Sequence, residues 1–333
     1  MSTRLIMKKS VIAAATAMAL FSTACESRLT GKEGNLQFSY DTVGDFTDFN
    51  KPLATGARLD LKVAEAVTKA NVTLEGASSD NEEVLGIHSY AGNVIVLEAR
   101  GDGRAEIGAE AKIPSGEVVE DFVDMRVRTA TKLVLTHSCA ADGDAHYLVD
   151  QDFVVHYKLE DDQGERLIGY GYHPVEVEPA GALTIDQTSK DQRSLHLSAQ
   201  SQVTTASLVS TIDATSATLP LVEESAIDGI KLRNNSPSTT VGTSNYVSFH
   251  PTVSDKPVCQ ARISMVAETS TPEFCSLPNT PAGDVIDEDL RLERNWVTVH
   301  GIAVGTCLIS VTYPDALMGQ GVTLEFEVEV KEL

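Results

Sequence analysis

Short segments in which apolar and polar residues alternate constrain the fold of this 333-residue chain more than any other feature. Because successive side chains of a strand point to opposite faces of a sheet, such alternation predicts strands with one buried and one wet face. The clearest segments are 59–63, 94–98, 153–159, 194–198 and 324–330. Turn residues separate them and long amphipathic helical patterns are scarce, so we expect an all-β chain of antiparallel sandwiches.

A weak internal repeat predicts how the chain divides. Residues 131–135 and 228–232 both resemble the opening strand of a new module, and their first residues lie about 97 positions apart. Each follows closely on a segment, 124–128 or 219–223, that reads as the last strand of the module before it. The predicted modules have the size of immunoglobulin-like sandwiches and are 37–129, 130–227 and 228–333.

The first 25 residues have the pattern of an export signal. Basic residues come first, an apolar run of 11 residues occupies 11–21, and Ser22-Thr23-Ala24-Cys25 follows. The run is too short to span a bilayer and small residues precede the cysteine, which favours cleavage over a membrane helix. The pattern resembles the lipobox of bacterial lipoproteins, although Ser22 stands where leucine is commonest in that family.

The lipobox resemblance implies that 1–24 is a lipoprotein signal peptide removed by cleavage and that the Cys25 thiol carries a diacylglycerol. Residues 25–36 are then the acylated cysteine and a flexible tether, because 26–36 is polar and contains two glycines. A general secretory signal beside a cysteine is the alternative. We expect a lipid-anchored protein of the bacterial envelope, on the outer membrane, with the periplasmic or surface face left open.

The charge balance limits the partners of the chain. It has 48 acidic and 26 basic residues, which give a formal net charge of −22. Such a field repels nucleic acid and anionic lipid head groups, so we expect no nucleic-acid partner. Membrane contact is expected through the N-terminal lipid, and the expected partner is a protein or another envelope component.

Four cysteines remain beyond Cys25, and an exported chain meets an oxidising compartment in which disulfides persist. Alternation places Cys259 and Cys307 on the inward faces of their strands, so a bond between them that joins the two sheets of one sandwich is the favoured pairing. Cys275 stands at the edge of a loop, which leaves a bond from it to either of those two open. The remaining cysteine of the last module is then free or bonded to Cys139, and a set of unpaired thiols is a further alternative.

The last module carries a second resemblance. The segment 297–311 contains Gly-Ile-Ala-Val-Gly-Thr-Cys-Leu-Ile and precedes the alternating strand 326–330. It resembles the end of a group 2 bacterial immunoglobulin-like repeat, in which a Gly-Val-Ala turn and a Gly-Thr-Ala-Thr-Ile strand precede a closing strand. Residues 93–127 echo the pattern. Cys307 and Arg104 replace the usual alanine and threonine, and the middle module lacks a clear copy.

This resemblance implies tandem immunoglobulin-like β-sandwich domains without catalytic activity and without a cofactor. In the family such repeats serve surface presentation, adhesion or protein–protein contact, and we expect the same class of role here by analogy of fold. Two alternatives stay open. One is an architectural spacer that binds no ligand, and the other is a metal-dependent, for example calcium-dependent, binding module or enzyme of the envelope.

Candidate metal ligands are sparse. The eight histidines form neither a His-x-x-x-His pair nor a His-Glu-x-x-His motif. The densest cluster lies near Cys139 and comprises Asp142, Asp144 and His146. Acidic loops offer hard oxygen ligands for calcium at 160–162 and at Asp287 and Asp289, but no segment has the spacing of an EF-hand loop.

The candidate ligand-binding residues are Tyr170 and Tyr172, within the stretch Gly169-Tyr170-Gly171-Tyr172-His173-Pro174. Exposed tyrosine rings stack on carbohydrate or peptide ligands, so these two residues are a possible platform. The favoured interpretation is structural: the glycines let a neighbouring backbone approach closely, the rings cover an edge, and Pro174 ends the strand.

Overall fold

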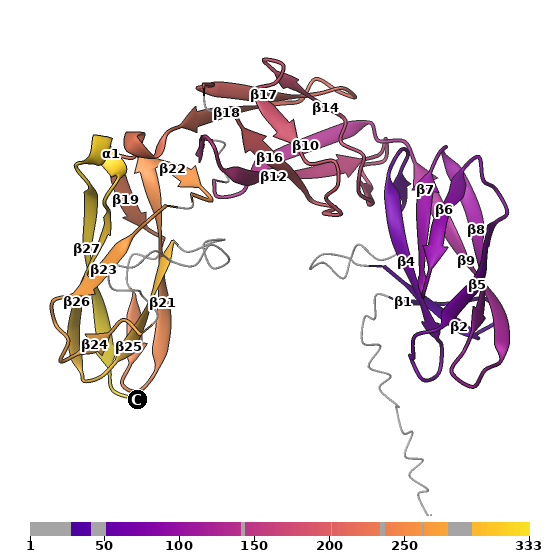
Figure 1. The fold of residues 1–333 in the computed structure, drawn as a ribbon, viewed down its shortest axis with the longest axis horizontal. Coiled ribbons are helices and arrows are strands. Elements are labelled where there is room, and N and C mark those ends of the chain that lie inside the picture. The colour runs from indigo at the N-terminus through magenta and orange to yellow at the C-terminus, as the bar shows by residue number, and fades with distance from the viewer. Residues whose placement is uncertain are drawn as a thin grey trace, which may run out of the picture.

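The computed structural model describes residues 28–40, 51–140, 144–200, 202–233, 237–261, 263–278 and 295–333. These residues form three β-sandwiches in a row, arranged as an arch with the middle sandwich across the top (Figure 1). Within the described ranges no helix is long and apolar enough to cross a membrane. The predicted signal peptide and Cys25, together with Asp142, Asp287 and Asp289, lie outside the described residues.

The N-terminal sandwich consists of a five-stranded and a four-stranded sheet. Its core lies between them and includes Phe38, Leu61 and Ile107, which are fully buried. The first sheet has the order β1 (Arg28–Thr30), β2 (Leu36–Ser39), β4 (Arg58–Glu65), β7 (Val94–Ala99), β6 (Leu85–Ala91). The second has the order β3 (Leu53–Ala54), β9 (Val118–Arg128), β8 (Gly103–Lys112), β5 (Thr73–Ser79).

The middle sandwich packs around Tyr147, Leu195, Leu208 and Leu219. One sheet has the order β10 (Lys132–His137), β12 (Asp152–Glu160), β16 (Ser194–Ala199), β15 (Leu183–Ile185), with β13 (Arg166–Leu167) beside β12. The other begins β14 (Val175–Glu178), β17 (Thr205–Ser210), β18 (Ser216–Val222). This second sheet continues through β11 (His146–Leu148) and β22 (Lys256–Cys259) into the C-terminal sandwich.

The C-terminal sandwich encloses a core that includes Phe249, Val299, Val311 and Tyr313. Its first sheet contains β19 (Gly229–Leu232), β21 (Ser244–Val253), β25 (Trp296–Gly301) and β24 (Cys275–Ser276). Its second has the order β20 (Ser238–Thr240), β27 (Val322–Lys331), β26 (Gly305–Tyr313), β23 (Val266–Thr269). Two single-turn elements, η2 (Glu224–Ala226) and α1 (Ala316–Gly319), contact each other near the middle sandwich.

The prediction of an all-β chain of sandwiches is confirmed. The five alternating segments lie in β4, β7, β12, β16 and β27. In β4 the apolar positions Leu59, Leu61 and Val63 are buried while the polar positions between them are partly exposed. Some residues also pack in the core of the neighbouring sandwich. Ile168, after β13, packs in the N-terminal core, and Leu148 of β11 packs in the C-terminal core. The middle core receives Ala54 and Ala57 from one neighbour and Cys259 from the other. Neighbouring sandwiches are therefore joined by packed side chains as well as by the chain itself.

Candidate functional site

The joint between the N-terminal and middle sandwiches is made by a short segment that follows β13. Ile168 accepts a hydrogen bond from Ala54 N at 3.0 Å, and Tyr170 exchanges two backbone hydrogen bonds of 2.9 Å with Arg58. Gly169 lies between them with φ of 113°, and a Cβ there would stand 2.7 Å from that of Ala57. Only glycine permits this approach, so the segment extends the pairing of one sandwich onto the next.

The two candidate ligand tyrosines lie in this joint. The Tyr170 hydroxyl donates to the Asp60 carboxylate, which also forms an ion pair with Lys190. The Tyr172 ring lies against Gly56, where a Cβ would come within 2.9 Å of the ring. These contacts engage the Tyr170 hydroxyl and the Tyr172 ring, so the two residues are components of the joint, as the structural interpretation expects.

We expect the joint to weaken in acid. Burial raises the pKa of Asp60, but hydrogen bonds from Lys190 and Tyr170 outweigh that effect and hold the pKa below its ordinary value. A carboxyl with a lowered pKa in the folded state stabilises the fold above its ordinary pKa of about 3.9, and that contribution disappears as the pH falls. Tyr170→Phe should therefore cost about 1–2 kcal/mol at pH 7 in urea unfolding, and less near pH 3.

The matched control is Tyr90→Phe, because Tyr90 is 44% exposed on the N-terminal sandwich and its hydroxyl donates a long hydrogen bond, 3.4 Å, to the backbone oxygen of Glu75. It should change the free energy of unfolding little at either pH. A cost of Tyr170→Phe that stays constant from pH 7 to pH 3 would show that the charge of Asp60 does not contribute.

The joint between the middle and C-terminal sandwiches is covalent as well as hydrogen-bonded. β11 pairs in parallel with β18 and with β22, so Tyr147 lies opposite both Leu221 and Cys259. A disulfide of 2.05 Å bonds Cys259 to Cys139. The side chain of the next residue, Gln260, accepts from Val154 N at 2.8 Å and donates to Val154 O at 3.3 Å. The Gln260 side-chain amide thus bonds both the N–H and the C=O of Val154 in β12, as the backbone of a paired strand would.

The favoured pairing Cys259–Cys307 is wrong, since the structure bonds Cys275 to Cys307 and Cys139 to Cys259. Alternation placed Cys259 and Cys307 inward correctly, and both are buried. They face different cores, however. Cys259 ends β22, which turns toward β11 and packs in the middle core, whereas Cys307 lies in the core of the C-terminal sandwich.

The candidate metal cluster is not assembled by the described residues. Cys139 is consumed by the disulfide, Asp144 forms an ion pair with Lys256 at 3.3 Å, and burial lowers the pKa of His146. In the ranges that the structure covers, no group of three or more His, Cys, Asp or Glu side chains could hold a metal ion.

The acidic turn 160–162 has its own explanation. Asp161 is buried and accepts hydrogen bonds from the backbone N–H groups of Gln163 and Glu165 at 2.9 and 2.8 Å. Glu160 forms ion pairs with Lys132 and Lys158 at 3.1 and 2.6 Å. Backbone donors and lysines thus satisfy the carboxylates of Asp161 and Glu160.

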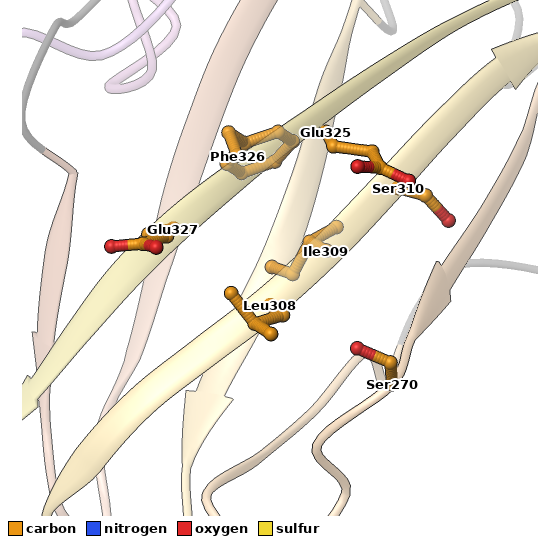
Figure 2. Close-up of a pocket in the computed structure, with 7 residues that line it drawn as sticks. All are labelled: Ser270, Leu308, Ile309, Ser310, Glu325, Phe326 and Glu327. Atoms are coloured by element: carbon orange, nitrogen blue, oxygen red, sulfur yellow. The ribbon is translucent and has the colours of Figure 1, made fainter.

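A groove of about 370 Å³ lies on the second sheet of the C-terminal sandwich. Figure 2 shows Leu308 of β26 between Glu327 of β27 on one side and Ser270 on the other. Leu308 is 40% exposed and lies opposite Glu327, and Ser310 lies opposite Glu325 in the same register. The residues that line the groove include two glutamates and no basic side chain, so it combines an apolar floor with negative charge.

The other sheet of this sandwich presents an aromatic face that the sequence analysis missed. Tyr246 of β21 is 65% exposed, and its ring meets that of Trp296 of β25 edge-on, with centroids 4.7 Å apart. Beside this pair, Ser244 Oγ lies 3.1 Å from His300 Nδ1. The available signals were the alternation around Tyr246 and the presence of a single tryptophan in the chain.

Comparisons with known proteins add little. No family model matches the chain, and no curated protein matches it by sequence. Among solved structures it is similar to the Escherichia coli adhesin FdeC, with 12% identity over 91% of this chain and 98% of that chain and a TM-score of 0.24.

Two further similarities are equally weak. The Bacteroides ovatus protein SGBP-B, solved with a mixed-linkage heptasaccharide, has 11% identity, covers 84% of this chain and 66% of that chain, and gives a TM-score of 0.29. Invasin, a bacterial integrin-binding protein, has 14% identity, covers 89% and 60%, and gives 0.23. With scores this low, none of the three supports an assignment of function.

Proposed function

We propose that this chain is an exported, lipid-anchored protein of the bacterial envelope whose three sandwiches form a rigid, non-catalytic scaffold for binding another envelope or surface protein. The predicted boundaries 37–129, 130–227 and 228–333 are part of the proposal. The observation that carries it is the pair of joints. A spacer requires only length, whereas strand pairing, the Asp60–Tyr170 contact and a disulfide hold the modules in one orientation.

Export and lipid anchoring are supported by the N-terminal pattern and by the two disulfides, which persist mainly in oxidising compartments. We expect Cys25→Ser to move the protein from the membrane pellet to the soluble fraction, because the acyl chains supply the membrane affinity. Fractionation followed by immunoblotting measures this shift. Recovery of the variant in the membrane pellet would contradict the lipid anchor.

The groove of the C-terminal sandwich is the proposed protein-binding site. Apolar surface at the centre of a patch supplies binding free energy, and charged groups at its rim select the partner by their sign. Leu308 supplies the apolar surface, and Glu325 and Glu327 supply the charged rim. The expected partner therefore presents lysine or arginine beside an apolar side chain.

A photo-crosslinking amino acid at position 308 tests this site in whole cells. The matched control is the same amino acid at position 67, because Val67 is 85% exposed on the N-terminal sandwich. We expect one repeatable adduct at 308 that Glu325→Lys with Glu327→Lys removes, and no adduct at 67. Absence of any adduct at 308 would favour the spacer over a binding scaffold.

Protease treatment of intact cells followed by mass spectrometry tests which side the modules face. Peptides from 37–333 that are released from unbroken cells would place the sandwiches outside. Complete protection would rule out a surface role and leave a periplasmic partner.

A further inference from the structure

The aromatic face of β21 and β25 differs in charge from the rest of the molecule. Val247 and Phe249 of β21 point into the core, so Tyr246 and Ser248 lie on the outward face. On β25, Trp296, Thr298 and His300 alternate with the buried Val297 and Val299. None of these outward side chains is a carboxylate, on a chain that has 48 acidic residues.

The face has both the stacking surface and the hydrogen-bonding groups that a sugar requires. Strand register places Tyr246 opposite Thr298 and Ser248 opposite Trp296, so the aromatic pair is fixed by adjacent strands. Aromatic rings offer flat apolar surface to the C–H groups of a pyranose. The Ser244 hydroxyl and His300 imidazole, in contact at 3.1 Å, lie at one end of the same face.

One buried polar group on this face has no partner. Thr298 is 4% exposed, and its hydroxyl makes no hydrogen bond. A buried hydroxyl without a partner costs free energy, and native structures rarely retain one without a reason. A ligand hydroxyl is a suitable partner for Thr298, since it can donate and accept.

We propose that the Tyr246–Trp296 face binds a neutral oligosaccharide, with the rings stacking on its pyranose units and Thr298, Ser244 and His300 bonding its hydroxyls. The absence of carboxylates excludes a site designed for cations or basic peptides. The nearest basic side chains stand beside β21: Lys231 of β19 lies opposite His250, and Arg233 N donates to Ser248 O at 2.9 Å. In Figure 1 β21 lies on the inner side of the arch and β26 and β27 on the outer side, so this site is separate from the acidic groove.

The position of the single tryptophan gives a direct test. Trp296 is the only tryptophan of the chain, so tryptophan fluorescence reports on this face alone. The full-length protein is titrated with cellohexaose, mannohexaose and chitohexaose as neutral probes and with hexagalacturonate as the anionic probe. We expect a saturable fluorescence change with at least one neutral probe and a weaker one with hexagalacturonate, which the net charge of −22 repels.

Three variants decide whether the binding is at this face. Tyr246→Ala removes an exposed ring and should weaken the binding by about tenfold or more, as loss of an aromatic anchor does. Tyr90→Ala, on the N-terminal sandwich, and Glu327→Lys, in the acidic groove, should leave the affinity unchanged. A lack of response to all three neutral probes, or equal affinities for Tyr246→Ala and Tyr90→Ala, would overturn the proposal and leave the protein-binding groove untouched.

Discussion

Replacing Cys139 and Cys259 together by alanine is expected to lower the free energy of unfolding by about 3–5 kcal/mol. The bond joins residues 120 positions apart, so it removes a large loop-closure entropy from the unfolded chain. It also connects a loop of the middle sandwich to β22, the strand that pairs with β11 of the middle sandwich and with β21 of the C-terminal sandwich. Its loss leaves the joint held by the short parallel pairing of β11 with β22, the side chain of Gln260 and the packing of Leu148 in the C-terminal core.

Two measurements separate the effect on stability from that on shape. Urea unfolding, followed separately for each transition because a three-module chain need not unfold in one step, gives the free energies. Small-angle X-ray scattering gives the maximum dimension, which we expect to become larger and more broadly distributed as the arch opens. The same treatment of Cys275 and Cys307, 32 positions apart within one sandwich, should lower stability and leave the shape unchanged. An unaltered scattering curve for the Cys139 and Cys259 variant would show that the hydrogen bonds alone fix the joint.

Asp121→Ala is expected to cost a similar amount, about 3–5 kcal/mol, at the other end of the molecule. Asp121 is fully buried in β9, and its carboxylate accepts backbone N–H groups of Glu33, Asn35 and Leu36 at 2.8 to 2.9 Å. Glu33 and Asn35 lie in the turn between β1 and β2, Leu36 begins β2, and Gly31 leaves room for the carboxylate beside it. Alanine would leave these three donors without their acceptor, and the turn would lose its side-chain contact with β9, while β2 stays paired with β4.

Hydrogen exchange of those three amides is the direct measurement. Their protection should fall to that of an open turn in Asp121→Ala, while amides of β8 keep theirs. Asp121→Asn retains one carbonyl oxygen, so an intermediate loss is expected. If exchange at Asn35 and Leu36 remained as slow as in the wild type, other contacts would have to hold the hairpin.

The strands were predictable because alternation is a local property of the sequence. Leu59, Leu61 and Val63 identify β4 without knowledge of any other strand, and the resemblance in the last module located β25 and β26 in the same way. Alternation also gave the inward direction of Cys259 and Cys307. These conclusions need only the two-residue period of a strand and the requirement that one face be buried.

Pairings between distant segments were not predictable. The partner of Cys259 depends on β22 lying beside β11, whose residues are more than 100 positions earlier in the chain. The same limit hid the aromatic face, because Tyr246 and Trp296 meet only through the register of β21 and β25. For Tyr170 and Tyr172 the flanking glycines suggested a close approach, but not that the approaching backbone belongs to another sandwich.

The Cys139–Cys259 bond also determines how the chain carries tension. If the chain is pulled from its N-terminal end and from the groove on β26, the covalent path runs from Cys139 to Cys259, so the backbone between these two residues does not carry the tension. That bypassed segment contains every strand from β11 to β21, which includes most of the middle sandwich. The disulfide keeps these 120 positions from being extended, and each would span about 3.5 Å. The maximum length of the stretched chain is therefore about 400 Å shorter with the bond than without it. Such a crosslink shields the top of the arch from mechanical unfolding while both ends stay attached.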